Sequence, residues 1–555
     1  MDKKEKTQKA NTNIKFTILA IVLIAIFCIS LTPVTFQNDT FYTIKIGEHI
    51  AQYGIDMQDP FSWHENLAYT YPHWLYDLLT YFIYSTFGFT GLYITTTILS
   101  AVLGISIFLV NKKLVKNELI SFLITIGAMY LLKDYIAARA QLVTFILFVL
   151  TIYFIERFLE TKKKRYAAGL IAIPIVIANM HVAVFPFYFI LYLPYIAEYA
   201  VASAAESIIY KKSIVRSLKR KIKKLSKVEG KEQEVEVLKE KLTKLEEKID
   251  KIKIKRSKEL QNPYKIKMTK NKNVKWLILI MIICILTGFL TPLGTTPYTY
   301  LIKTMQGNTT QNINEHLPLT LINNNDILVT LILFLAVLIF TKAKIRLSDL
   351  FMLGGLCYLM FMSRRQFSMF VIVCSLILNR LIIEMMTIYL GKEALEKIAK
   401  KFASTIGMLI ISIAVLLLSY YMAKDKIDDK YINESDYPVA ACDYIIKNID
   451  LGTARFYNEY NYGSYMLYRG IPVFIDSRAD LYAPEFSGKE DDIFMDFIET
   501  SGISKFYGDI FDKYDITHVI TYENSKVSMI IDETQSDLYK ELYRDDSFVI
   551  YERVR

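Results

Sequence analysis

The sequence predicts a polytopic α-helical membrane protein with about eleven transmembrane helices, followed by a C-terminal α/β domain outside the membrane. The chain has 555 residues, of which 53% are hydrophobic, and long apolar runs recur along most of its length. Basic residues gather at alternate ends of these runs, and the pattern changes to short strands and helices after residue 422. A soluble globular protein is therefore excluded.

Each predicted span is an apolar run close to the length that crosses a bilayer as a helix. The runs are 16–34, 89–110, 118–133, 140–158, 167–180, 182–200, 276–291, 327–341, 349–363, 367–386 and 403–421. A further apolar helix at 75–88 either completes the first outer loop or makes a twelfth span. No small-residue cleavage site follows the first run, so we expect this span to be retained.

The orientation follows from the positive charges. If the N-terminus is cytoplasmic, every predicted inner segment is basic, as the positive-inside rule requires. These segments contain Lys3, Lys4, Lys6, Lys9, Lys112, Lys113, Lys116, Lys162, Lys163, Lys164, Arg165, Lys342, Lys344, Arg346, Lys397, Lys400 and Lys401, and the block 211–275. The C-terminal domain is then extracellular, and the protein is a multi-pass protein of the cell membrane.

A charged insertion at 204–275 interrupts the membrane pattern. Apolar residues alternate at spacings of three and four on both sides of Glu229-Gly230-Lys231, which is typical of a coiled-coil seam. Because both ends enter the membrane on the same side, we expect a cytoplasmic helical hairpin that turns near Gly230. Its basic balance is compatible with nucleic acid or anionic lipid, but a solvated coiled coil is the simpler interpretation, and no nucleic-acid partner is expected.

The insertion and the change at 422 divide the chain into four parts. The ranges are 1–203 with the first outer loop at 35–77, then 204–275, 276–422 and 423–555. In the last part, strands are predicted at Ala454–Tyr457, Val473–Ile475, His518–Thr521 and Phe548–Tyr551, with helices at Val439–Asn448 and Asp491–Thr500. No nucleotide-binding or nucleophile-elbow motif occurs in it.

The first outer loop carries the most informative acidic residue, Asp39. It precedes a short helix whose stripe Tyr42, Ile46, Ile50 and Tyr53 predicts a helix lying in the membrane interface. A carboxylate at that level suits chemistry on a lipid-linked substrate. The structural alternative is that Asp39 caps a helix beginning at Thr40.

Other polar residues also fall at the outer ends of predicted spans and suggest a cavity that opens outward. They are His73, Arg139, Gln141, Asn179, His181, Glu315, His316, Arg364 and Arg365. The arginines are suited to hold a lipid-carrier phosphate, with the lipid tail among the helices. Headgroup anchoring and turn formation remain alternatives. No histidine pair has metal-ligand spacing, and the five cysteines show no close pairing, so we expect no metal centre and no disulfide framework.

Several motifs, in this order along the chain, resemble the bacterial branch of the GT-C glycosyltransferases related to protein O-mannosyltransferases and lipid A sugar transferases. They are Asn38-Asp39-Thr40-Phe41-Tyr42, Gly47-Glu48, Asp59-Pro60-Phe61-Ser62, His73-Trp74-Leu75, Arg139-Ala140-Gln141-Leu142, Asn179-Met180-His181, Thr291-Pro292-Leu293-Gly294, Glu315-His316-Leu317-Pro318, Ser363-Arg364-Arg365, Asn458-Glu459-Tyr460-Asn461-Tyr462-Gly463 and Phe474-Ile475-Asp476-Ser477-Arg478-Ala479-Asp480. The resemblance covers most of the chain except 204–275.

The resemblance implies an inverting hexosyl- or pentosyltransferase that moves a sugar from a polyprenyl-phosphate donor to a glycan, lipid or protein acceptor at the outer face. It implies Asp39 as the catalytic carboxylate. The expected substrate-binding residues are His73, Arg139, Asn179, His181, Glu315, Arg364 and Arg365. No paired acidic motif is evident in a later outer loop, so no cofactor is expected, although a divalent metal stays open.

Two other function classes fit parts of the sequence. A transporter or flippase for a lipid-linked sugar would use similar helices and a similar cavity, but no internal repeat with broken helices is found. A membrane scaffold or sensor would use the coiled coil and the outer domain. Such an anchor has no need of the elaborated loop around Asp39.

Overall fold

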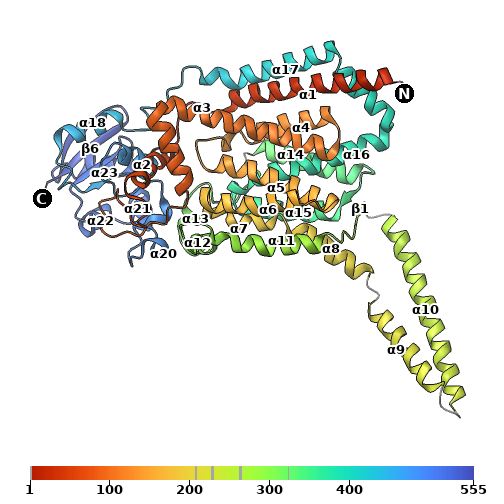
Figure 1. Ribbon diagram of the computed structural model, residues 1–555. Coiled ribbons are helices and arrows are strands. Elements are labelled where there is room, and N and C mark those ends of the chain that lie inside the picture. The colour runs from red at the N-terminus through yellow and green to blue at the C-terminus, as the bar shows by residue number, and fades with distance from the viewer. Residues whose placement is uncertain (1–2, 207–208, 227–230, 262–264, 323, 555) are drawn as a thin grey trace.

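The computed structural model describes residues 3–554 apart from 207–208, 227–230, 262–264 and 323. A bundle of long helices carries a small α/β domain at one end and a projecting pair of helices, α9 and α10, toward the other (Figure 1). The N-terminus lies at the end opposite the α/β domain, which contains the C-terminus. This arrangement matches the predicted fold class.

Every predicted span coincides with helix. The bundle consists of α1 (Lys3–Leu31), α3 (Trp74–Val115), α4 (Glu118–Leu131), α5 (Gln141–Thr161), α6 (Lys164–Met180), α7 (Phe185–Ile190), α8 (Leu193–Glu206), α11 (Val274–Leu286), α14 (Asn325–Phe340), α15 (Leu347–Met362), α16 (Phe367–Phe402) and α17 (Thr405–Ala423). Short elements join them: η1 (Lys133–Tyr135), η2 (Val182–Val184), η3 (Thr287–Phe289), η4 (Arg364–Gln366) and η5 (Lys424–Lys426).

Among the described residues, six helical segments are long and apolar enough to cross a membrane by themselves. They are Ile14–Leu31, Trp74–Val115, Gln141–Thr161, Val182–Ala204, Arg364–Phe402 and Thr405–Lys426. Four shorter apolar helices, α4, α11 with η3, α14 and α15, complete the bundle. The apolar helix predicted at 75–88 is the first part of α3, which bends at Gly88, where φ is 62°. A glycine adopts this angle without steric strain.

Four buried or half-buried charged side chains hold three helices of the bundle together. Glu156 of α5 accepts hydrogen bonds from Arg346, and Arg346 also pairs with Asp349 of α15. Arg380 of α16 forms ion pairs with both carboxylates, at 3.0 Å each. Two positive and two negative groups thus compensate one another between three helices, which makes their burial tolerable.

The hairpin consists of α9 (Ile209–Leu225) and α10 (Glu232–Gln261), which lie side by side and are joined by an ion pair between Lys219 and Glu246 (Figure 1). The turn expected near Gly230 lies outside the described residues. Where the chain returns to the bundle, strand β1 (Ile266–Lys267) pairs in parallel with β2 (Ile345–Arg346).

The C-terminal α/β domain, which begins at residue 423 and is called the outer domain below, packs helices on a four-stranded sheet of order β3-β4-β6-β5. β3 and β4 are parallel, whereas β6 is antiparallel to both β4 and β5. The elements are α18 (Val439–Asn448), β3 (Phe456–Tyr457), α19 (Tyr460–Tyr468), η6 (Ala479–Tyr482), α20 (Pro484–Ser487), α21 (Ile493–Gly502), α22 (Tyr507–Lys513), β4 (His518–Tyr522), α23 (Lys526–Thr534), β5 (Tyr539–Arg544) and β6 (Phe548–Arg553). The strand β5 was not predicted.

The predicted strand Val473–Ile475 is not part of this sheet. Instead, Val473 forms a parallel bridge with Ser62 of the first outer loop. The same loop donates a hydrogen bond from Trp63 Nε1 to the carbonyl of Phe456 at 2.9 Å. The loop and the outer domain are therefore one packed unit.

The helix after Asp39, α2 (Asn38–Tyr53), belongs to this unit, so its prediction as a membrane-interface helix is wrong. It lies between α3 and α19, and Phe41 and Ile46 are fully buried. The Phe41 ring packs against Tyr437 and Tyr465, with ring centroids 4.9 and 5.1 Å away. Only Tyr53 of the predicted stripe is exposed, because α3 and the outer domain cover the rest.

An ion-pair triad fixes the loop to the outer domain. Arg478 contacts Asp59 at 2.7 Å and Asp476 at 2.6 Å, and all three side chains are buried. Burial alone would raise the pKa of Asp59, but Arg478 outweighs this effect and holds the pKa below its usual value. The guanidinium also lies over the rings of Phe61 and Tyr69.

We expect Asp59→Asn to release the loop, because Arg478 would lose its buried ion pair with the loop and keep only Asp476, which belongs to the outer domain like Arg478 itself. Breaking a buried pair costs about 3 kcal/mol or more, which corresponds to roughly 10 °C in melting temperature for a domain of this size. Thermal unfolding in detergent, followed with limited proteolysis of the outer domain, measures the effect. The control Asp443→Asn removes a surface partner of Arg469 and should change little. Equal stability of both variants would contradict this role of the triad.

The topology predicts opposite accessibility for two exposed positions. Asn524 lies in the outer domain and Thr243 in the hairpin, and both side chains are exposed. A cysteine at Asn524 should react with a membrane-impermeant maleimide added to intact cells, whereas a cysteine at Thr243 should react only after lysis. The reverse pattern would overturn the orientation.

Candidate functional site

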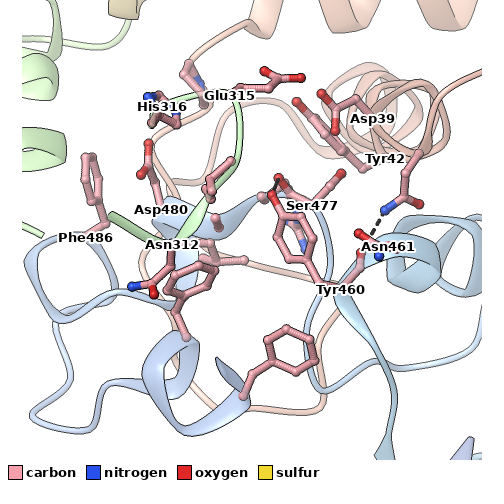
Figure 2. Close-up of a pocket in the computed structure, with 18 of the residues that line it drawn as sticks. Asp39, Tyr42, Asn312, Glu315, His316, Tyr460, Asn461, Ser477, Asp480 and Phe486 are labelled. Atoms are coloured by element: carbon pink, nitrogen blue, oxygen red, sulfur yellow. Dashed lines mark hydrogen bonds between the residues drawn. The ribbon is translucent and has the colours of Figure 1, made fainter. Parts of the chain in front are cut away.

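A cavity of about 550 Å³, the outer pocket, lies between the first outer loop, the segment before α14 and the outer domain. α12 (Thr296–Gln306) and α13 (Thr309–Asn312) lead into that segment. Figure 2 shows Asp39, Glu315 and His316 along one side, facing Tyr460, Ser477 and Asp480 of the outer domain. Residues from opposite ends of the chain thus share one cavity.

At this pocket, Arg139 lies between two carboxylates. Its Nε is 2.9 Å from Asp39 Oδ2, and its Nη1 donates a hydrogen bond of 2.9 Å to Glu315 Oε1. The Nε–H is not directed at a hydrogen-bond acceptor, so the contact with Asp39 is an ion pair only. Asp39 accepts no hydrogen bond in the described part of the chain, which leaves its lone pairs available to a substrate.

Asp39 does not cap its helix. α2 begins at Asn38 with Gln37 at the cap position, so Asp39 stands in the first turn. The capping alternative, which assumed a helix beginning at Thr40, is therefore wrong. A carboxylate in the first turn is favoured by the helix dipole, and this one faces Arg139.

The pKa shifts of Arg139 and Glu315 both favour the charged form. Burial disfavours the charge on Arg139, but Asp39 and Glu315 outweigh burial and raise the pKa of Arg139. Burial likewise opposes the charge on Glu315, and Arg139 and Arg365 lower the pKa of its carboxyl below the usual value.

A second cavity of about 610 Å³, the side pocket, adjoins the first. The two share Arg139, Asn314, Glu315 and Arg365. Arg364 lies in the side pocket, where its Nε donates to the carbonyl of Pro318 at 3.4 Å. The guanidinium of Arg365 forms no hydrogen bond or ion pair with any described residue, so its donors remain free for an anion.

The side pocket continues into an apolar groove of about 360 Å³ between α4, α14 and α16. Tyr130, Leu131 and Asp326 line both cavities. The groove is formed almost wholly by aliphatic and aromatic side chains, among them Leu123, Val329, Leu333, Phe370 and Leu378. A path therefore runs from apolar surface in the bundle, past free arginine donors, to Asp39.

Of the remaining predicted site residues, His73 lines the outer pocket, whereas His181 and Asn179 do not. The ring of His181 is buried 4.9 Å from that of His73, and its Nδ1 lies 3.0 Å from Thr144 Oγ1. Burial, followed by the nearby Arg365, lowers the pKa of His73 to about 3, and burial also lowers that of His181. Both rings are thus neutral.

The side chain of Asn179 forms hydrogen bonds within the protein instead. Its side chain accepts from Trp74 Nε1 at 3.2 Å and donates to the carbonyls of Ile175 and Leu290. It joins the start of α3 to the end of α6 and to the segment after η3. The polarity of Asn179 suggested substrate contact, but all these partners belong to the protein itself.

The outer-domain wall of the pocket was not among the predicted site residues. Asp480 accepts hydrogen bonds from Tyr300 at 2.7 Å and from Thr309 at 3.1 Å, which ties this wall to α12 and α13. Tyr460, whose hydroxyl donates to the carbonyl of Ser477, contributes an aromatic face. The sequence contains recognisable motifs around both residues, but only the tertiary structure places these residues at the outer pocket.

Three aromatic residues in and beside the first outer loop divide in the same way. Tyr42 lines the outer pocket, whereas Trp63 and Trp74 hydrogen-bond elsewhere in the protein. As for metals, no group of three or more His, Cys, Asp or Glu residues in the described ranges could hold an ion.

The fold can be compared with known proteins. No family model matches the chain, and no similar curated protein is found. The chain superposes on the crystal structure of the Archaeoglobus fulgidus oligosaccharyltransferase in its apo form with a TM-score of 0.51 and 12% identity. The superposition covers 97% of this chain and 74% of that one. The two proteins share a fold.

This similarity supports the predicted fold class, a helical membrane part followed by a C-terminal α/β domain. At 12% identity it concerns the fold alone. The closer relation to the bacterial branch, the number of spans and the orientation of the termini stay predictions.

Because Glu459 of the outer pocket is buried, we predict that the free energy of unfolding depends on pH. Burial raises the pKa of its carboxyl from 4.5 to about 7, since a single weak hydrogen bond from the Tyr522 amide opposes burial. The folded state therefore holds this proton more tightly than the unfolded state, and stability falls as the pH rises from 4.5 to about 7.

Glu459→Gln should remove this fall. The variant should match the wild type near pH 4.5 and exceed its stability by roughly 2–3 kcal/mol above pH 7. Melting temperatures across this range test it, with the exposed Glu490→Gln as control. A constant difference at all pH values would contradict the pKa assignment.

Proposed function

We propose that the protein is a membrane glycosyltransferase that moves a sugar from a polyprenyl-phosphate donor to an acceptor at the outer face. The observation that carries this proposal is the continuous path from the apolar groove through the side pocket to Asp39. An amphiphilic donor has the same three parts in the same order: an apolar tail, a phosphate and a polar sugar. The shared fold with an oligosaccharyltransferase is consistent with this activity.

The donor would enter the groove laterally from the bilayer. Its polyprenyl tail would contact apolar side chains of the groove, among them Leu123, Val329 and Phe370. The phosphate would then lie beside Arg365, whose guanidinium has free donors, with Arg364 nearby in the side pocket. Planar guanidinium donors match phosphate oxygens in pairs and offset the charge that grows on the leaving group.

Asp39 would act as the general base. Its carboxylate lies in the outer pocket, where the acceptor hydroxyl would approach the anomeric carbon on the side opposite the phosphate. The C–O bond to the phosphate breaks as the bond to the acceptor oxygen forms, and the acceptor proton passes to Asp39. A single displacement inverts the anomeric configuration, and no covalent intermediate is needed.

The outer domain would hold the acceptor. Tyr460, Asn461, Ser477 and Asp480 form the wall that faces Asp39 across the pocket (Figure 2). Amide, hydroxyl and carboxylate groups beside aromatic rings can orient hydroxyl-rich or peptide acceptors. The triad around Arg478 fixes the distance between this wall and the first outer loop.

Asp39→Asn tests the proposal, because the substitution keeps the side-chain size and removes the proton acceptor. We expect transfer from a panel of polyprenyl-phosphate hexoses and pentoses to fall roughly 100-fold or more. Purified proteins with matched melting temperatures are compared by the release of polyprenyl phosphate. The control Glu48→Gln removes a carboxylate from the same helix outside the outer pocket and should keep activity. Transfer by Asp39→Asn at the wild-type rate would remove Asp39 as the base.

A further inference from the structure

Three separate outer segments meet at the guanidinium of Arg139. Asp39 comes from the first turn of α2, Glu315 from the segment between α13 and α14, and Arg139 from the segment between η1 and α5. Each carboxylate contacts a different nitrogen of Arg139, and both distances are 2.9 Å. All three residues line the outer pocket, and Arg139 and Glu315 also line the side pocket.

Two carboxylates at one cavity edge need a cation. Without one, their mutual repulsion would raise the pKa of one carboxyl, which would then hold a proton. Where a phosphate must also be bound, proteins commonly place a divalent metal ion between carboxylates and phosphate. Here the position shared by Asp39 and Glu315 is filled by a side chain of the protein.

We propose that Arg139 is a built-in cation that takes the place of a divalent metal ion at this site. Its positive charge faces both carboxylates at 2.9 Å and fixes Asp39 and Glu315 at the boundary between the two pockets. Arg139 acts on the reaction through these carboxylates and is therefore a positioning residue. The site accordingly works without an added metal ion.

Several features of the site support this assignment. The described residues contain no third acidic, histidine or cysteine ligand grouped with Asp39 and Glu315 that would complete a metal site. The two neighbouring imidazoles, His73 and His316, both have a pKa lowered by burial and by Arg365, so they add no positive charge. Arginine also remains charged at every physiological pH, and its planar guanidinium group has several N–H donors, so it can contact two carboxylates at once.

Manganese binding tests the proposal without reference to activity. Electron paramagnetic resonance of purified wild-type protein titrated with Mn²⁺ should show no bound ion at the outer pocket. Arg139→Ala should acquire Mn²⁺ binding, and this binding should be lost in Arg139→Ala combined with Asp39→Asn. Mn²⁺ bound by the wild type and lost on Asp39→Asn would overturn the proposal, as would a folded Arg139→Ala that gains none. If Arg139→Ala does not fold, Arg139→Gln keeps more of the packing and serves as the second variant.

Transfer activity provides a further readout that rests on the proposed function. Wild-type transfer should be unchanged by EDTA, and the activity lost in Arg139→Ala should be restored partly by guanidinium ions or by Mn²⁺. In Arg139→Lys, a single ammonium group replaces the guanidinium and stabilises the two carboxylates less. The acid limb of the pH–rate profile should therefore move upward by about one pH unit. Loss of wild-type transfer in EDTA would overturn the proposal and leave the transferase function standing. A wild type inactive under every condition would refute that function instead, and the Mn²⁺ titration would still decide the role of Arg139.

Discussion

The buried triad of Asp59, Arg478 and Asp476 is the constraint on which the outer face depends. Asp59 is more than 400 positions from Arg478 and Asp476 in the chain. Its contact of 2.7 Å with Arg478, which also contacts Asp476 at 2.6 Å, fixes the first outer loop to the outer domain. Because a buried charge without a partner is costly, the loop and the domain must dock in one register. Every wall of the outer pocket is placed by that register.

Docking also explains the buried apolar residues of α2, which contacts both α3 and the outer domain. Phe41 and Ile46 pack against the outer domain and α3, and Gly47 lies where a Cβ atom would be 2.1 Å from the backbone oxygen of Asp77. A helix this close to its neighbour has little freedom to shift. The first turn of α2, with Asp39, is therefore held rigidly beside Arg139, as a preorganised site requires.

The fold was largely predictable, because hydropathy and charge report directly on a bilayer. Apolar runs gave the helices of the bundle, and the basic segments gave a consistent topology. Residues such as Arg139, Glu315 and Arg365 could be placed on one face by topology alone, and they do share a cavity. The helix predicted at 75–88 and the span predicted at 89–110 are the two parts of α3, and a positive φ at Gly88 divides them.

The rest of the site depends on contacts that leave no local pattern. The expected position of α2 in the membrane interface was wrong. The periodicity of its apolar residues shows that one face of the helix is covered, but it does not show whether lipid or a domain distant in the sequence covers that face. Polarity likewise suggested Asn179 and His181 as substrate contacts, yet their hydrogen-bond partners are Trp74 and Thr144. The outer-domain wall with Tyr460 and Asp480 required the tertiary structure itself.

In the proposed function, a lipid-linked donor reaches Asp39 through the apolar groove and the side pocket. Photo-crosslinking with a polyprenyl phosphate that carries a diazirine on its first isoprene unit tests this path without knowledge of the sugar. The account predicts crosslinks in α4, α14 and the start of α16, and a strong loss of yield in Arg365→Ala. Crosslinks mainly on α1 and α17, with the same yield in Arg365→Ala, would contradict it.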